Sequence, residues 1–274
     1  NSFKECSGLE EVLFDKVNNI KVGYGCFSNS RCLKKFTLNA DSLDFEDGCF
    51  ESCTSLDSVT IQGSRDIEFS KSIFKSCSSL KNVEITTTST LKIANKFFEG
   101  ANKIDHVKLT CNNLLVSEGC MSKCQELTRL EISITGNATF GRSQFENLTK
   151  LSSFSLELND SIQNKERTVL FEDNCFSGTN NLRDFNITIS KKNSKSYNQK
   201  CISILTLGKS CFSGLKNMTN LIFPFEKITI GDNCFLNNSI RSISFPNATE
   251  FTAGTCSFKG CTSLHDFSIP LASS

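Results

Sequence analysis

The chain has 274 residues, of which 22% are charged, and its formal net charge is +1 at pH 7. This balance gives no electrostatic reason to expect nucleic acid or an anionic membrane surface as a partner. No apolar run reaches the eighteen or so residues that a membrane-spanning helix needs. Hydrophobic residues make up 38%, but their use is uneven: 24 Phe and 15 Cys occur with 3 Pro and no Trp. Such a bias indicates that a few residue types fill fixed positions of a repeat.

A Phe, replaced once by Met, recurs every 23 or 24 residues, apart from two longer gaps of 31 and 36 residues. These anchor residues are Phe3, Phe27, Phe50, Phe74, Phe98, Met121, Phe145, Phe176, Phe212, Phe235 and Phe258. Each repeat reads F-x-x-C-x-x-L-x-x-V-x-I, then a short polar stretch, then I-x-I-x-x-x-C-F. The V-x-I and I-x-I pieces alternate with period two, so we expect two short strands per repeat, each with one buried face.

The segment around each anchor has helix-like spacing over only a turn or two. Asp47, Asp173 and Asp232 each lie three residues before an anchor, where they are expected to cap short helical turns. A single repeat cannot bury its apolar face alone, whereas stacked repeats form a continuous core. The sequence therefore predicts a β-rich repeat solenoid of about ten units with short helical turns. We expect one domain over residues 1–274 that is a fragment of a longer chain, because neither end has a polar capping unit.

The two long gaps place insertions at residues 157–168 and 189–202, in the same link of adjacent repeats. Insertions at one position of a solenoid emerge on one face, which is often a binding face. The second insertion is basic and contains a Tyr, so it is a candidate binding surface. Its candidate residues are Lys191, Lys192, Lys195, Tyr197 and Lys200. The alternative is that both insertions are surface loops that diverged in sequence and have no binding function.

The pattern L-x-x-V-x-I-P…I-x-I-G-x-x-C-F-x-x-C resembles the BspA-like leucine-rich repeats of bacterial surface proteins and parasitic protists. All three prolines, Pro224, Pro246 and Pro270, follow the last apolar residue of the first predicted strand, where that family has its Pro. Gly208 and Gly231 match the family's Gly before the turn. The Pro column is empty in the first seven repeats. The resemblance implies a right-handed solenoid with a β-sheet along its concave side, and roles in adhesion and protein binding at cell surfaces.

Most cysteines fall in two columns of the repeat. Six directly precede an anchor (Cys26, Cys49, Cys120, Cys175, Cys211 and Cys234), and five follow one by three residues (Cys6, Cys53, Cys77, Cys124 and Cys261). Apolar or small residues take these positions elsewhere, so we expect unpaired core thiols, with one or two disulfides as an alternative and a metal site as a remote one. The remaining four, Cys32, Cys111, Cys201 and Cys256, are expected to be exposed or paired. Abundant free thiols favour a reducing compartment, in conflict with a surface role.

Outward positions of the first predicted strand form two polar columns on the presumed concave sheet. Charge is concentrated there in the third to fifth repeats, which gives the candidate binding residues Glu84, His106, Lys108, Arg129 and Glu131. One interpretation is a polar binding patch, although it lacks the aromatic side chains of a tight protein hot spot. The other is a solvated strand surface with cross-strand Glu–Lys pairs.

No motif in the chain predicts catalysis, since the two histidines, His106 and His265, lie in distant repeats and no nucleophile elbow or phosphate loop occurs. We therefore predict a non-catalytic module without cofactor or metal, a cell-surface adhesion or ligand-binding domain. Its partner would be a host or matrix protein, or another surface protein. The alternatives are an intracellular, cytoplasmic scaffold with a reduced cysteine core and, remotely, a β-solenoid enzyme acting on polysaccharide.

Overall fold

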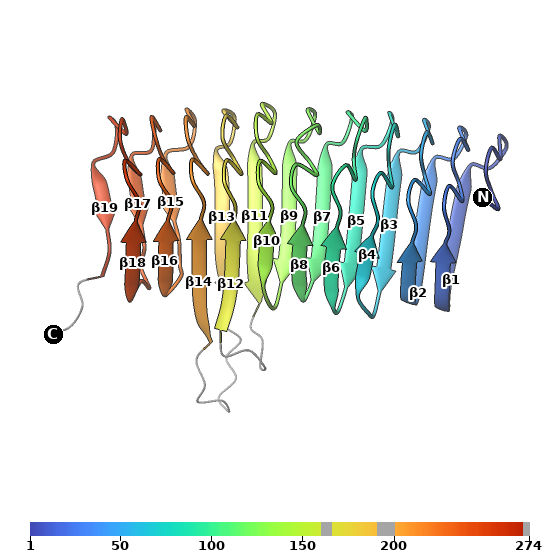
Figure 1. Cartoon of the computed structure of the whole chain (residues 1–274), viewed down its shortest axis with the longest axis horizontal. Helices are drawn as coiled ribbons and strands as arrows, with labels where there is room; N and C mark the ends of the chain where they lie inside the picture. The colour runs from blue at the N-terminus through green and yellow to red at the C-terminus, as the bar shows by residue number, and fades with distance from the viewer. Residues whose placement is uncertain (160–165, 191–200, 271–274) are drawn as a thin grey trace. The chain divides into compact units, whose positions relative to one another are not determined.

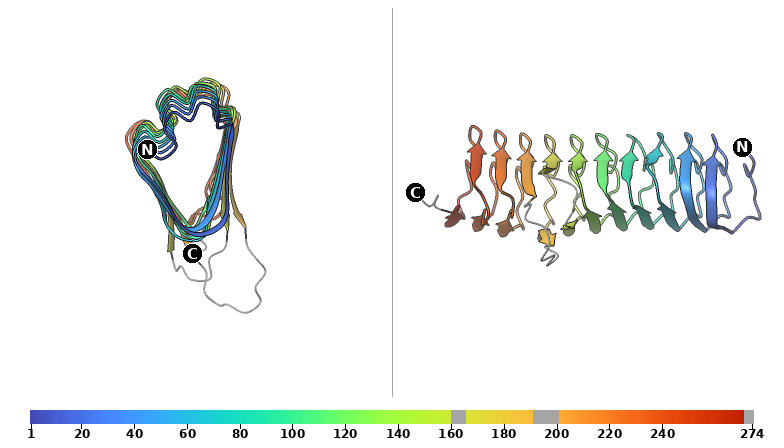
Figure 2. Two further views of the ribbon diagram at one scale, coloured as in Figure 1. Left: turned by 90° about the vertical axis from the view of Figure 1, so that its right-hand side faces the viewer. Right: turned by 90° about the horizontal axis from the view of Figure 1, so that it is seen from below.

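The computed structural model describes residues 1–159, 166–190 and 201–270. They belong to two compact units, Asn1–Glu131 and Ile132–Ser274. In both, successive repeats stack as a parallel β-solenoid (Figure 1). In the left view of Figure 2 the repeats of each unit superpose, with the turns at one end and the strands along two sides. The predicted solenoid of about ten repeats is thus confirmed, whereas one domain over residues 1–274 stays a prediction.

The first unit contains two strand ladders. Its strands are β1 (Glu11–Val22), β2 (Lys35–Phe45), β3 (Ser58–Gly63), β4 (Ile67–Phe69), β5 (Asn82–Thr87), β6 (Thr90–Ile93), β7 (His106–Cys111) and β8 (Asn113–Val116). The first strands of successive repeats pair as β3–β5–β7, and the second strands pair as β4–β6–β8. Strand β9 (Arg129–Ile134) begins in this unit. From the third repeat on, the prediction of two strands per repeat is confirmed.

In the first two repeats the two predicted strands merge. β1 has 12 residues and β2 has 11, and β2 pairs with β1, β3 and β4. Along β2 every second residue is buried from Phe36 to Ala40, and the alternation resumes at Leu43. The two predicted strands therefore continue as one. In the third repeat β3 ends at Gly63, a residue that weakens a strand interior and often marks a break in it.

The second unit has the same two ladders. Its strands are β10 (Ala138–Phe140), β11 (Ser153–Asn159), β12 (Glu166–Phe171), β13 (Asp184–Ser190), β14 (Ile202–Leu207), β15 (Asn220–Ile222), β16 (Lys227–Ile230), β17 (Ser242–Ser244), β18 (Glu250–Ala253) and β19 (Asp266–Ser268). First strands pair as β11–β13 and as β15–β17–β19. Second strands pair as β10–β12–β14–β16–β18.

The proline column determines how far the first strands extend. β15, β17 and β19 have three residues each, and Pro224, Pro246 or Pro270 follows two residues after their ends. β11 and β13, in repeats without Pro, have seven. Proline has no backbone N–H to donate to a ladder, so it ends the strand and turns the chain toward the second ladder.

The predicted helical turns are wrong: no residue of the described ranges is helical. The anchor segments are instead consecutive tight turns, in which Ser28 N donates to Gly25 O at 3.0 Å and Ser30 N donates to Phe27 O at 3.0 Å. Gly25, two residues before Phe27, has a φ of 55°, and Asn29, two residues after it, has a φ of 59°. A residue in the left-handed conformation cannot continue an α-helix. The other anchors also have a residue of positive φ at one or both of these positions.

The three acidic residues expected to cap those turns have another role. Asp47 Oδ1 accepts a hydrogen bond from Lys71 N at 3.0 Å. Asp173 Oδ1 accepts one from Lys209 N at 2.8 Å, and Asp232 Oδ1 one from Thr255 N at 2.6 Å. Each carboxylate therefore binds a backbone amide of the following repeat, not of its own turn.

Stacked anchor rings form the core at the turns. Phe27 and Phe50 are stacked with their ring centroids 5.2 Å apart, and Phe212 and Phe235 at 5.3 Å. These four rings are at most 1% exposed. The rings repeat at the spacing of the ladders, so each repeat buries its anchor against both neighbours.

The six cysteines that precede an anchor are buried, as expected, and among the second column Cys53, Cys77 and Cys124 are buried as well. All fifteen cysteines lie in described residues, and no disulfide joins any two of them. Cys32 and Cys256 are exposed and Cys201 is partly exposed, but Cys111 is buried, contrary to expectation, because it ends β7 on the inward side.

The described residues of the two insertions are strand residues apart from Cys201: 157–159 and 166–168 belong to β11 and β12, and 189–190 and 202 to β13 and β14. The candidate binding residues of the second insertion lie outside the described residues. They are Lys191, Lys192, Lys195, Tyr197 and Lys200.

Candidate interaction surface

The five charged residues singled out on the first strands lie on one face of the first unit. We call Glu84, His106, Lys108, Arg129 and Glu131 the charged face; they come from β5, β7 and β9. Side chains alternate along a strand, and the residues between them, such as Val107, Leu109 and Leu130, are buried in the core. Burial of this apolar set fixes which side chains point outward.

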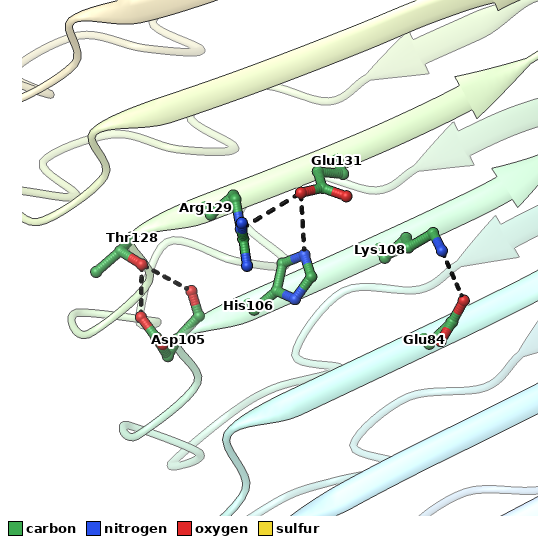
Figure 3. Close-up of polar contacts among 7 residues, drawn as sticks. All are labelled: Glu84, Asp105, His106, Lys108, Thr128, Arg129 and Glu131. Atoms are coloured by element: carbon green, nitrogen blue, oxygen red, sulfur yellow. Dashed lines mark hydrogen bonds and ion pairs between the residues drawn. The ribbon is translucent and has the colours of Figure 1, made fainter.

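The charged face is held by one ion pair between neighbouring strands and one within a strand (Figure 3). The ladder places Glu84 beside Lys108, and Lys108 Nζ lies 3.0 Å from Glu84 Oε1. That hydrogen bond and charge raise the pKa of Lys108. Arg129 Nε lies 3.3 Å from Glu131 Oε1 within β9. The structure therefore brings the predicted residues together, and Glu84 with Lys108 forms a cross-strand Glu–Lys pair of the kind that a solvated strand surface would also have.

His106 occupies the middle of the face. Its Nε2 lies 3.6 Å from Glu131 Oε1, which is beyond hydrogen-bond distance. The same atom is buried without a hydrogen-bond partner. Glu131 thus faces Arg129 and His106 together, and its contact with His106 is ionic only when the imidazole is protonated.

Two further residues at the edge of this face escaped the sequence analysis. Thr128 Oγ1 donates to Asp105 Oδ1 at 2.5 Å (Figure 3). Asp105 and Thr128 directly precede His106 and Arg129 in the chain. The sequence signal for these two residues is a column of polar residues one position before the first strand of each repeat. This column lies outside the outward strand positions from which the charged face was predicted.

That column alternates in charge through the first unit. It runs Glu10, Lys34, Asp57, Lys81 and Asp105 in successive repeats. Lys34 Nζ lies 2.8 Å from Glu10 Oε2, and Lys81 Nζ lies 2.7 Å from Asp57 Oδ1. Exposed pairs of this kind contribute little to the free energy of unfolding, so their main effect is to balance the charge of each repeat with that of its neighbour.

The first-strand face of the second unit differs in composition. Its outward residues on β15, β17 and β19 are small or amide side chains with one acid and one apolar residue: Asn220, Ile222, Ser242, Ser244, Asp266 and Ser268. Hydroxyls pair along it, as in Ser268 Oγ to Ser244 Oγ at 2.8 Å. None of these six residues is basic, so the charge found in the first unit is not continued on these strands.

Within the described residues, no group of three or more His, Cys, Asp or Glu side chains could hold a metal ion. The second histidine, His265, is exposed in the second unit and pairs with Asp266 through Nδ1 at 3.0 Å. No helix of the described residues is long and apolar enough to cross a membrane.

Parallel strands stacked at one period and a ladder of anchor rings are consistent with a leucine-rich-repeat solenoid. The chain belongs to the family described as BspA type Leucine rich repeat region (6 copies), whose sequence model matches residues 1–90, 67–205 and 199–273. The family resemblance noted in the sequence is thereby confirmed.

Two solved structures are similar to the chain. One is a leucine rich cell surface protein from Faecalibacterium prausnitzii A2-165, with 15% identity, a TM-score of 0.32, and coverage of 90% of this chain and 82% of that chain. The other is a leucine-rich repeat protein from Bacteroides ovatus ATCC 8483, with 17% identity, a TM-score of 0.31, and coverage of 92% and 86%. No curated protein matches the chain.

Proposed function

We propose that the chain is a non-catalytic protein-interaction module that binds a protein partner through the charged face. The observation that carries this proposal is the convergence of two ion pairs, Lys108 with Glu84 and Arg129 with Glu131, and of His106 between them, from three successive strands. The parallel ladders use the backbone groups of β5 and β7, so these strands offer a partner only their side chains. A surface already ordered in this way loses less conformational entropy on binding.

The partner would present charges of both signs in a complementary order. The face carries Lys108 and Arg129 against Glu84 and Glu131, so it has no strong net charge. Complementary charges favour specificity and association rate more than affinity. Because the face has no aromatic anchor, binding gains strength from several repeats engaged at once.

Charge reversal with a matched control tests this surface. Immobilised extracellular matrix proteins would be screened for binding of the chain, and the dissociation constant measured for each binder. Lys108→Glu is expected to weaken binding at least tenfold, because it puts two acids side by side in the face. Lys92→Glu is the control, since Lys92 Nζ also lies 3.0 Å from a carboxylate, Glu68, but on the other ladder. Equal effects of the two substitutions would contradict the proposal.

We place the module at a cell surface, as an adhesion or ligand-binding domain, because this location fits the family membership of the chain. Biotinylation of intact source cells tests the location: a labelled, protease-sensitive chain supports it. An unlabelled chain contradicts it and favours the second candidate, an intracellular scaffold. The buried thiols without disulfides are the observation that favours this scaffold.

A further inference from the structure

Three cysteines of the second unit stack in successive repeats. Cys175, Cys211 and Cys234 each precede an anchor Phe, and each is 0% exposed. Their turns are hydrogen-bonded directly to one another: Phe176 N donates to Cys211 O at 2.8 Å, and Phe212 N donates to Cys234 O at 2.8 Å. We call these three residues the thiol ladder.

The side chains of the thiol ladder contact each other. The anchor rings that follow these cysteines stack with centroids 5.1 Å apart for Phe176 and Phe212 and 5.3 Å apart for Phe212 and Phe235, so the three cysteines repeat at the same short spacing. The thiol of Cys211 is close enough to Cys175 and Cys234 for both to affect its pKa. Neighbouring strands of a ladder lie about 4.8 Å apart, within the separation of about 4.4–6.8 Å that a disulfide spans between Cα atoms. Stacked Cβ atoms at this spacing lie just beyond the distance of about 3.5–4.5 Å that a disulfide spans between Cβ atoms, so adjacent members can be joined after a small approach of their two turns. Cys175 and Cys234 are separated by two such steps.

We propose that the thiol ladder is a redox modification site in which Cys211 forms one disulfide, with either Cys175 or Cys234. The two thiols lose two protons and two electrons to a peroxide, as when hydrogen peroxide is reduced to two molecules of water. Cys211 has one sulfur, so the third thiol of the ladder stays reduced. The bond ties two successive repeats together covalently.

Burial controls when this reaction occurs. Desolvation raises the pKa of the Cys211 and Cys234 thiols well above the ordinary value, and the thiolate is the reactive form. Oxidation of the folded chain is therefore slow and requires the turn to open, whereas oxidation during folding is fast. An oxidising compartment would yield the bonded form and a reducing one the thiol form, whichever partner the charged face binds.

Peptide mapping tests the proposal on the full chain. The reduced chain is refolded with and without hydrogen peroxide, alkylated after unfolding, digested without reduction and examined by mass spectrometry. We expect Cys211 linked to Cys175 or Cys234, one alkylated thiol from the ladder, and a higher melting temperature of the oxidised form. Cys111 serves as the internal control and is expected to stay alkylated, because it is buried and no other cysteine contributes to its raised pKa. Cys211 recovered only as the alkylated thiol would overturn the proposal.

Single substitutions add a second readout. Cys175→Ala and Cys234→Ala are each expected to retain one disulfide at Cys211. Cys211→Ala is expected to leave both neighbours reduced and to abolish the shift in melting temperature. A Cys175–Cys234 disulfide in that variant would contradict the spacing on which the proposal rests. The mapping of the unsubstituted chain decides the question even if a variant fails to fold.

Discussion

The residue three positions after the anchor is a hydrogen-bond donor as well as a core side chain. In six repeats of the described residues it donates to the carbonyl of the anchor one repeat earlier. These bonds are Ser30–Phe3 at 2.6 Å, Cys53–Phe27 at 3.0 Å, Cys77–Phe50 at 3.0 Å, Thr179–Phe145 at 2.9 Å, Asn238–Phe212 at 2.7 Å and Cys261–Phe235 at 3.0 Å. The sequence analysis treated the cysteines of this column as apolar filler, which describes only half of their role.

Substitution of Cys53 separates the donor from the filler. Cys53→Ser keeps a donor that Ser30 already uses in the same column, so its cost is expected to stay below about 1 kcal/mol. Cys53→Ala loses the bond and leaves a small void, at a cost of about 1–2 kcal/mol. Urea denaturation of both variants measures the difference. A Ser variant as unstable as the Ala variant would show that the bond contributes nothing.

The same residue predicts a loss of stability at high pH. Burial raises the pKa of the Cys53 thiol from 9.0 to about 12. The unfolded chain releases this proton near pH 9, whereas the folded chain retains it. The contribution of Cys53 to the free energy of unfolding is therefore complete below pH 9 and falls by about 1.4 kcal/mol per pH unit up to pH 12. The free energy of unfolding, measured by urea denaturation between pH 9 and 12, should therefore fall less steeply with pH for Cys53→Ser than for the unsubstituted chain. Parallel slopes would contradict this assignment.

At the scale of the elements, the glycine before the turn allows backbones to approach closely. A Cβ on Gly208 would lie 2.6 Å from Asp173 N, and one on Gly231 would lie 2.7 Å from Gly208 C. Contacts this short to backbone atoms cannot be relieved by rotating a side chain, so the repeats would have to separate.

Gly208→Ala is accordingly expected to cost about 1–3 kcal/mol. Gly8→Ala is the control, because a Cβ there would meet nothing within 4 Å, and its cost should be near zero. Thermal or urea denaturation of the two variants gives the comparison. Similar stabilities would indicate that the close approach is not what requires glycine at this position.

The strands were predictable from the sequence, and the turns were not. The V-x-I and I-x-I pieces have one buried face each, so their period two identifies strands such as β5 and β6 directly. In the turns, the spacing of Asp47 and Phe50 suits a helical turn equally well. The left-handed residues Gly48 and Ser52 decide against a helix, but Ser gives little sign of positive φ in a sequence. The acceptor role of Asp47 depends on the neighbouring repeat, which the spacing within one repeat does not show.

The charged face was predictable as a set of residues but not as pairs. Outward positions follow from the alternation of β7, which places His106 and Lys108 on one side. The choice of partner depends on register and rotamer: Glu131 is shared by Arg129 and His106, and no pattern in the sequence specifies that. Asp105 was missed because it precedes the strand.

At the scale of the whole molecule, each repeat is stabilised by its two neighbours. Phe176 stacks on Phe145 at 4.8 Å and on Phe212 at 5.1 Å. In such an array stability is close to a sum of repeat and nearest-neighbour terms, so a defect in one repeat weakens the repeats beside it most.

Phe176→Leu tests this locality, with an expected cost of about 1–2 kcal/mol. Hydrogen exchange monitored by mass spectrometry should show lower protection in β11–β14 and unchanged protection in β3–β6. A uniform loss of protection along the chain would instead indicate one cooperative folding unit.

The alternating column of the first unit constrains how an array of this kind can change its length. Glu10, Lys34, Asp57, Lys81 and Asp105 place opposite charges in neighbouring repeats. Removing the single repeat that carries Lys34 would set Glu10 against Asp57, and duplicating it would set two lysines side by side. Loss or gain of two consecutive repeats preserves the alternation. In this part of the chain, the unit that recombination can insert or delete without electrostatic repulsion is a pair of repeats.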